Sequence, residues 1–237
     1  MRADLVLIFG GDGSILSAAR RMGANQIPVF GVNFGKLGFL TLCSADEFEE
    51  RLGAVLAVGI RAVPRMMLEA RLLRDGEEIY RSLALNDGVI GRVTLSRMIE
   101  VRLSIAEEAV TTTVGDGLIV ATPVGSTAHS LSAGGPIVQA DMEAIVLTPI
   151  CPHTLSHRPL VLPPERVIRC ELGPETTEAM LTMDGQDNRE LRVGDQVLFG
   201  RAEPRFLLVD ANPHSYYTVL RKKLHWGIPP RLEENRS

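Results

Sequence analysis

The segment that most constrains the fold is a glycine turn that follows a short apolar run near the start of the chain. The apolar run covers residues 4–9, and GGDG occupies residues 10–13. An unbroken apolar run of this length is typical of a buried parallel strand. Glycines followed by small and helix-forming residues indicate a tight turn into a helix, expected over residues 14–22 with Ser14 as its cap. The chain therefore opens with a strand, a turn and a helix.

The same alternation occurs once more, with a strand expected over residues 26–32 and a helix over residues 45–58. This order predicts a parallel sheet with right-handed crossovers. Two strands are few for such a sheet. Either the sheet takes strands from elsewhere in the chain, or the chain is truncated at its start.

The pattern changes near residue 63, after which short apolar or alternating segments and Asp-Gly turns predict a mostly antiparallel β structure. Strands are expected over residues 67–73, 79–86, 98–105, 167–172, 179–183, 196–200 and 206–209. A final helix is expected over residues 215–224.

These segments predict an α/β fold with two domains. A short, Rossmann-like α/β domain that carries GGDG would comprise residues 1–63. A β-rich, sandwich-like domain would follow over residues 64–211. The C-terminal helix would return to the first domain, so residues 212–237 are assigned to it.

Composition limits the classes of partner. The chain has 237 residues, a formal net charge of −4 and a pI near 5.8, which argue against nucleic acid or an anionic membrane as the main partner. No segment is apolar enough to predict a membrane span. Three widely spaced cysteines favour neither a disulfide framework nor a metal site, so a cytoplasmic location is expected.

The glycines of GGDG suit phosphate, because Gly10, Gly11 and Gly13 let a ligand approach the backbone at the start of a helix. The segment is neither a P-loop nor a GxGxxG fingerprint. The carboxylate of Asp12 is unusual beside phosphates. It either holds a cation or accepts a proton from an attacking hydroxyl, unless it is merely part of a turn.

Two further segments favour ligand binding. NFGKLGFL at residues 33–40 follows the second predicted strand, at the edge where open α/β sheets bind ligands. Residues 115–136 contain five glycines and many small hydroxyl side chains. Such a run offers backbone N–H groups and short donors suited to ribose and amide groups, although a structural loop is the alternative.

Together these segments resemble the NAD kinase family. The resemblance rests on FGGDGSILSAAR, NFGKLGFL, LND, DGLIVATPVGSTAHSLSAGGPI, PICPHTL, RPLVLP and the tail SYYTVLRKKLHWG, in the family's order through nearly the whole chain. GGDG alone is weak evidence, because lipid kinases and phosphofructokinases carry similar elements. The run TPVGSTAHSLSAGGP is far more specific.

The resemblance implies transfer of a phosphoryl group from ATP, or from polyphosphate, to the 2′-hydroxyl of the adenosine ribose of NAD, which yields NADP. It implies a divalent cation (Mg²⁺ or Mn²⁺) bound mainly through the ATP phosphates, and a homodimer or homotetramer. Asp12 would be the catalytic base. The residues it implies for NAD binding are Asp12, Gly13, Asn86, Asp87, Arg97, Asp116, Thr127, Ala128, His129, Ser130, Leu131, Ser132, Cys151 and Gln186.

Five positions depart from the family pattern. Leu40 and Val124 are apolar where some relatives have polar or aromatic groups. Asp87 stands where the family usually has Glu, His129 where it often has Tyr, and Val114 where a polar or basic residue is common. The short N-terminus and the changes at Asp87 and Val114 keep open a non-catalytic NAD(P)-binding protein. The shared GGDG also leaves open a kinase of another acceptor, such as a lipid.

Two motifs suggest other chemistry but lack its context. His153 and His157 have the spacing of zinc ligands on a helix, yet prolines flank them and no further ligands are expected nearby. Ser126 lies in a segment that does not match the GxSxG turn of hydrolases. Neither a zinc enzyme nor a serine hydrolase is predicted.

Overall fold

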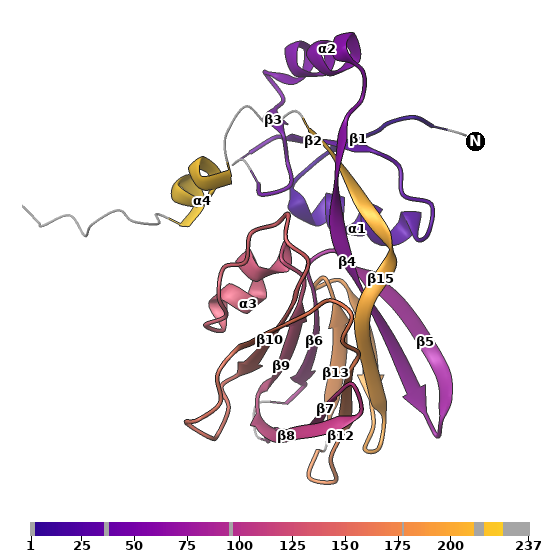
Figure 1. Cartoon of the computed structure of the whole chain (residues 1–237), viewed down its shortest axis with the longest axis vertical. Coiled ribbons are helices and arrows are strands. Elements are labelled where there is room, and N and C mark those ends of the chain that lie inside the picture. The colour runs from indigo at the N-terminus through magenta and orange to yellow at the C-terminus, as the bar shows by residue number, and fades with distance from the viewer. Residues whose placement is uncertain (1–2, 36–37, 95–96, 177, 211–215, 225–237) are drawn as a thin grey trace, which may run out of the picture.

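The computed structural model of the chain describes residues 3–35, 38–94, 97–176, 178–210 and 216–224. Most of the helical structure lies in one part of the molecule and two stacked sheets form most of the other, with one short helix, His129–Ser132, against the end of the stacked sheets (Figure 1). The four α-helices described are α1 (Asp12–Met22), α2 (Phe48–Val58), α3 (His129–Ser132) and α4 (Tyr216–Leu224), and the turn η1 (Gly125–Thr127) precedes α3. Among the described residues, no helix has the length and apolar character needed to cross a bilayer.

The first sheet has nine strands and runs through both parts. Its strands are β1 (Val6–Phe9), β2 (Val29–Asn33), β3 (Cys43–Ser44), β4 (Ala62–Arg74), β5 (Glu77–Ala84), β7 (Ile99–Ile105), β8 (Glu108–Gly115), β12 (Ile168–Leu172) and β15 (Gln196–Val209). The second sheet has six strands, β6 (Asp87–Arg92), β9 (Gly117–Ala121), β10 (Ile145–Ile150), β11 (Leu160–Leu162), β13 (Ala179–Met183) and β14 (Asp187–Leu191). The predicted combination of an α/β region with a β sandwich is confirmed.

The small parallel sheet at the start of the chain borrows a strand from its far end. β1 and β2 pair in parallel, and the end of β15 joins β2 in parallel where Leu208 lies opposite Val29. The separate strands expected over residues 196–200 and 206–209 are wrong, because β15 is continuous. A register shift between Arg201 and Arg205 lets this long strand serve both parts of the molecule.

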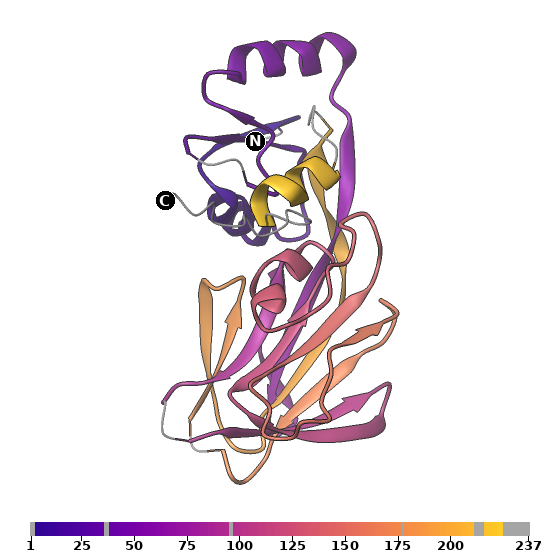
Figure 2. The same cartoon turned by 90° about the vertical axis from the view of Figure 1, so that its left-hand side faces the viewer.

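The predicted domain boundary falls inside β4, which pairs with β15 on both sides of that point. The two parts therefore share strands, and the division at residue 63 stays a prediction. α4 buries Val219 and Leu220 and lies at the level of the α/β part of the molecule, beyond the end of the sandwich (Figure 2). Ser215 and most of residues 212–237 lie outside the described residues.

Some expected boundaries are wrong. α1 begins at Asp12 instead of residue 14; Gly11 is its N-cap, with no side-chain hydrogen bond, so Ser14 is not the cap. α2 begins at Phe48, three residues later than expected. The strands β3, β6, β8, β9, β10, β11 and β14 were not predicted. The shift in α1 matters most, because it places Asp12 in the first helical turn.

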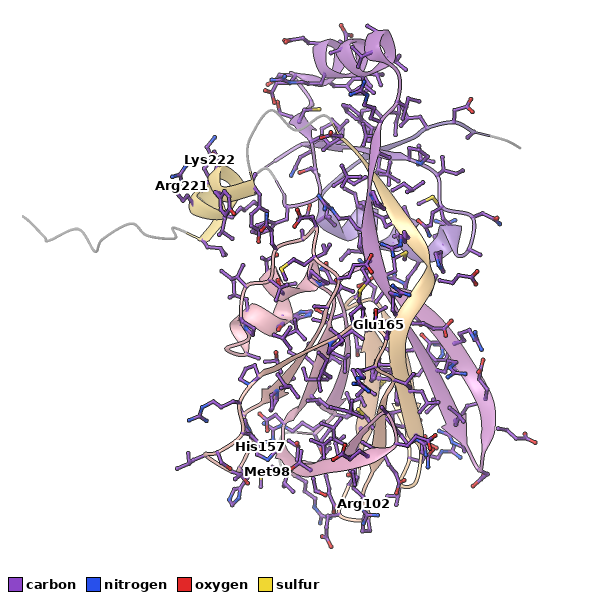
Figure 3. All side chains as sticks on the ribbon, viewed as in Figure 1. Met98, Arg102, His157, Glu165, Arg221 and Lys222 are labelled. Carbon is purple, nitrogen blue, oxygen red and sulfur yellow. The ribbon has the colours of Figure 1, made fainter. Side chains whose placement is uncertain are left out.

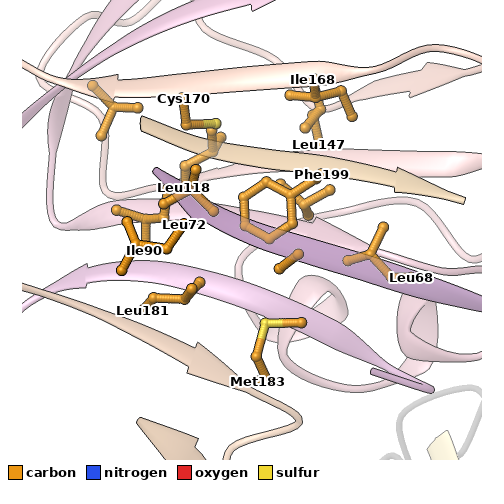
Figure 4. Packing of buried hydrophobic residues seen from close by; sticks show 14 of the residues in the cluster. Leu68, Leu72, Ile90, Leu118, Leu147, Ile168, Cys170, Leu181, Met183 and Phe199 are labelled. Carbon is orange, nitrogen blue, oxygen red and sulfur yellow. The ribbon is translucent and has the colours of Figure 1, made fainter. Parts of the chain in front are cut away.

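The larger core lies between the two sheets. Phe199 of the first sheet is fully buried and points toward Met183 of the second (Figure 4). A second core lies under α1, where Ile15 and Phe30 meet residues of β15 such as Phe206. Each core buries apolar side chains of β15, so this strand ties the two parts together.

Candidate active site

Asp12 is held by the loop that follows β2. Its Oδ2 accepts a hydrogen bond from the backbone N–H of Phe39 at 2.9 Å, and its Oδ1 accepts one from Leu40 at 3.1 Å. The side chain also lies at the positive end of the α1 dipole, which favours a negative charge. GGDG and NFGKLGFL are therefore two halves of one site, although Lys36 and Leu37 of the second segment are outside the described residues.

Two glycines of these segments are required by close packing. A Cβ atom at Gly38 would overlap the carboxylate of Asp12. Gly10 has a φ of 159°, and a Cβ there would lie 2.5 Å from the hydroxyl oxygen of Ser14. Gly11 is different, because it is exposed and nothing lies within 4 Å of a Cβ at that position. The backbone at Gly11 is open to a ligand.

The hairpin turn between β13 and β14 contacts α1 from the other side. Gln186 donates a hydrogen bond of 2.9 Å from Nε2 to the carbonyl oxygen of Gly13. Its Oε1 accepts a hydrogen bond of 2.7 Å from Arg20, which lies further along α1. Arg20 also pairs with Asp184 at 3.1 Å. The predicted Gln186 therefore meets the predicted Gly13 directly.

Asp184 binds the segment that precedes β6. Its Oδ1 accepts hydrogen bonds from the N–H groups of Asn86 and Asp87, at 2.8 and 3.3 Å, and its Oδ2 accepts one from Leu85 at 3.1 Å. The carboxylate has no exposed surface. Burial raises the pKa of Asp184 to about 6, and the bonds from the backbone of Asn86 and Leu85 oppose this rise. At neutral pH the carboxylate is mostly ionised.

Asp87 and His129 form a pair beside this turn. Nδ1 of His129 lies 3.4 Å from Oδ1 of Asp87. The hydrogen bond with Asp87 raises the pKa of His129. The side chain of Asp87 is buried, and its Oδ2 has no hydrogen-bond partner among the described residues, whereas the ring of His129 is 61% exposed. Asp87 therefore faces His129, and the imidazole faces solvent.

The glycine- and hydroxyl-rich run makes a compact structure next to Asn86. Thr122 donates a hydrogen bond of 2.6 Å from Oγ1 to the carbonyl oxygen of Leu85. Its backbone N–H donates one of 2.8 Å to the carbonyl oxygen of Asn86. Gly125 packs so closely that a Cβ would overlap the carbonyl of Asn86. The hydroxyl of Ser130 is buried and bonds Thr148 at 2.8 Å. Part of this run thus supports the fold, and the rest borders the site.

An apolar cavity of about 210 Å³ adjoins the loop that holds Asp12. Phe39, Leu40 and Thr127 line it, so it reaches both the Asp12 loop and the hydroxyl-rich run. Arg65 lines it from β4, and its Nη1 is buried with no hydrogen-bond partner among the described residues. Such a mixture of apolar walls and a few polar groups is typical of small-molecule sites.

Three predicted residues, Asp116, Arg97 and Cys151, form a second group at the other end of the second sheet. Arg92 pairs with Asp116 through two contacts of 3.0 and 3.1 Å. Cys151 directly follows β10, whose end pairs with the start of β9 beside Asp116, and has a positive φ of 43°. The exposed Arg97 precedes β7, whose first residue lies opposite Gly115. β6 runs from the first group to the second, and its five steps span roughly 16 Å.

Two features fall outside both groups. His157 lies at the end of the sandwich far from α1 (Figure 3), with its Nδ1 3.4 Å from the hydroxyl of Thr113. Arg221 and Lys222 project outward from α4 (Figure 3). Sequence reasoning missed Arg20 and Asp184; the Asp-Gly turn signal located Asp184 but gave no hint of its buried contacts.

Family models match most of the chain. The ATP-NAD kinase N-terminal domain matches residues 1–60, and the ATP-NAD kinase C-terminal domain matches residues 85–211. The NAD kinase of Geobacter sulfurreducens is 45% identical over 225 residues, which cover 95% of this chain and 79% of that protein. The NAD kinase of Azoarcus sp. is 44% identical over 230 residues, which cover 97% and 78%.

Solved structures have the same fold. The yeast NADH kinase complexed with NADH superposes with a TM-score of 0.89 at 33% identity, covering 98% of this chain and 68% of that one. The NAD kinase from Archaeoglobus fulgidus in complex with ATP has a TM-score of 0.78 at 28% identity, covering 94% and 83%. The similarity thus includes both the helical part and the sandwich.

Proposed function

The chain belongs to the NAD kinase family and is an enzyme that phosphorylates NAD to NADP, and we propose that Asp12 is the catalytic residue of this reaction. The observation that carries the proposal is the position of its carboxylate. It stands in the first turn of α1, between a glycine turn suited to phosphate and a loop that holds both of its oxygens.

In the proposed step, Asp12 orients the 2′-hydroxyl of the adenosine ribose and accepts its proton as the oxygen attacks the γ-phosphorus. The bond from that phosphorus to the leaving nucleoside diphosphate breaks. A carboxylate offers about four acceptor directions, and the bonds from Phe39 and Leu40 use two of them. The others are available to a hydroxyl. Alignment of this kind supplies much of the catalysis in phosphoryl transfer.

The phosphates of the donor are proposed to lie at the N-terminus of α1. Gly10, Gly11 and Gly13 present backbone there, and the helix dipole favours an anion. Among the described residues, no three His, Cys, Asp or Glu side chains converge as a ligand set. The half-exposed carboxylate of Asp12 beside a phosphate turn fits a divalent cation, Mg²⁺ or Mn²⁺, held mainly by the donor phosphates. The cation would neutralise part of the charge of those phosphates.

The adenine ring is proposed to enter the apolar cavity lined by Phe39 and Thr127. The base and the 2′-hydroxyl are attached to adjacent ribose carbons, so a hydroxyl at Asp12 requires the ring to lie close by. The unpartnered Nη1 of Arg65 can donate to a ring nitrogen. Asn86, with its backbone fixed by Asp184, and the exposed ring of His129 are proposed to contact the rest of the dinucleotide.

A homo-oligomer is proposed to complete the site. Asp116, Arg97 and Cys151 are expected to bind NAD, yet they lie at the other end of β6 from Asp87. In a symmetric dimer or tetramer, this second group of one subunit can face the Asp12 group of its neighbour. A cytoplasmic location is also proposed, because all three cysteines are unpaired.

Incubation of the purified chain with NAD, ATP and Mg²⁺ tests this function. The expected result is NADP, detected with an NADP-specific dehydrogenase, in equal amounts with ADP. A parallel incubation with polyphosphate in place of ATP identifies the donor. Calorimetric binding of NAD with no NADP from either donor would overturn the catalytic role.

A further inference from the structure

The turn between β13 and β14 ties the catalytic helix to the segment that is proposed to contact NAD. Asp184 and Gly185 both have positive φ, of 51° and 67°, and the N–H of Gln186 returns to the carbonyl of Met183 at 3.0 Å. These values make a tight turn, and three residues, 184–186, separate the paired Met183 and Asp187. The turn points the carboxylate of Asp184 inward, where it is fully buried.

Asp184 contacts both sides of the site at once. On one side it accepts the N–H groups of Leu85, Asn86 and Asp87, and on the other it pairs with Arg20 of α1. Arg20 is itself only 13% exposed in its side chain. A buried carboxylate that accepts hydrogen bonds from four donors is held in one geometry. Removing Arg20 would leave this charge buried without its ion-pair partner, which destabilises the folded state.

Arg20 extends these contacts with the hairpin turn along α1. Its second nitrogen bonds Gln186, and Gln186 bonds the carbonyl of Gly13, the residue after Asp12. The first turn of α1 and its third turn are therefore both fixed to the same hairpin. That hairpin also holds the backbone of Asn86.

We propose that Arg20 and Asp184 are positioning residues that set the alignment of Asp12 with the dinucleotide by locking α1 to the Leu85–Asp87 segment. This inference rests on the proposed role of Asp12. Neither residue touches the reacting atoms; each acts through Asp12 or Asn86. A shift of about 1 Å in such an alignment lowers turnover by up to about 100-fold.

Arg20→Ala tests the proposal, with Arg21→Ala as its matched control, since Arg21 lies on the same helix and is exposed. Arg20→Ala is expected to lower kcat on the order of 10-fold or more, with a much smaller change in the KM for NAD. Arg21→Ala is expected to match the wild type. Assays are run well below each Tm, with folding checked by circular dichroism. If Arg20→Ala does not fold, Arg20→Lys, which keeps the charge but loses the two-pronged contact, takes its place.

A double-mutant cycle makes the test specific. Asp184→Asn should lower kcat as well, and the double variant with Arg20→Ala should lose less than the product of the two single losses. Amide hydrogen exchange at residues 85–87 should speed up in Asp184→Asn without any substrate present. A folded Arg20→Ala enzyme with wild-type kcat, or fully independent effects, would overturn the inference. The proposed function would fail separately, through a wild-type enzyme that forms no NADP.

Discussion

Oδ2 of Asp12 accepts a hydrogen bond of 2.9 Å from the backbone N–H of Phe39, which lies 27 residues further along the chain. This contact explains why a carboxylate can stand in a glycine turn that favours phosphate. The loop N–H groups and the start of α1 stabilise its charge, so the side chain remains an acceptor. Its position depends on the loop as much as on the helix.

Gly38→Ala is expected to displace Asp12, because the new Cβ would overlap the carboxylate. We expect turnover to fall about 10- to 100-fold, since a small misplacement of a reacting group has effects of this size. Gly53→Ala is the control: nothing lies near a Cβ at Gly53, in the exposed middle of α2, and alanine there should stabilise by about 0.5–1 kcal/mol. Equal kinetics for the two variants would show that the loop does not set the position of Asp12.

The pair of His129 and Asp87 should make stability depend on pH. Because Asp87 raises the pKa of His129 above its ordinary 6.5, the folded state favours the imidazolium. This contribution is fully present below the unfolded-state pKa and is lost as pH rises through the higher folded-state pKa. Urea unfolding of wild type and His129→Asn should therefore show the wild-type advantage shrinking above pH of about 6.5.

The carboxyl of Asp184 has a pKa raised to about 6 and titrates mainly below the pH range in which His129 loses its proton. It is present in both the wild type and His129→Asn. Asp87→Asn should remove most of the same pH dependence, since the hydrogen bond and charge of Asp87 are the main causes of the raised pKa of His129, with a smaller contribution from Asp184. Parallel stability profiles for wild type and His129→Asn from pH 6 to 8 would contradict the pairing.

Phe199 should be among the most sensitive positions of the sandwich core. It is fully buried, and its ring lies against the backbone of Gly88 and the sulfur of Met183. Phe199→Ala should lower the free energy of unfolding by about 3–5 kcal/mol in chemical denaturation. The exposed Val193→Ala should change it by no more than about 0.5 kcal/mol. A small effect at Phe199 would mean that the two sheets are not packed through this ring.

Subunit mixing can test the proposed oligomeric site. Asp12→Asn and Asp116→Ala should each be nearly inactive alone. If the two residues act across an interface, co-refolded mixtures should regain activity, with roughly a quarter of the sites intact in random dimers. No recovery in a mixture shown by native mass spectrometry to contain hetero-oligomers would place both residues in one subunit's site.

Local signals predicted the parts of the molecule that depend on neighbours in sequence. The Asp-Gly turns at Asp75 and Asp184 specify backbone conformations that few other residues adopt, and both turns have positive φ. The strand β13 was predicted with its bounds because a short apolar segment is followed there by an Asp-Gly turn. The resemblance then supplied residues that no periodicity could assign.

Long-range contacts could not be predicted in this way. Arg20 and Asp184 are 164 residues apart, and nothing near either residue indicates the other. The continuity of β15 was missed because residues 201–205 are polar and contain a proline, yet pairing with β4 on both sides carries the strand through. The start of α1 was misplaced because Ser14 is a better cap by propensity than Gly11, whereas the ties of Asp12 to Phe39 and Leu40 favour the earlier start.

The turnover number of Asp12→Asn, measured as NADP formed from NAD and ATP, tests the central claim most directly. Circular dichroism should match the wild type, because the amide has nearly the same size. Its NH2 group cannot accept the N–H of Phe39 or Leu40, so NAD binding is checked by calorimetry and kcat is measured at saturating NAD. We expect kcat to fall on the order of 10²–10⁴-fold, the usual contribution of a catalytic base. A folded Asp12→Asn enzyme that turns over at close to the wild-type rate would contradict it.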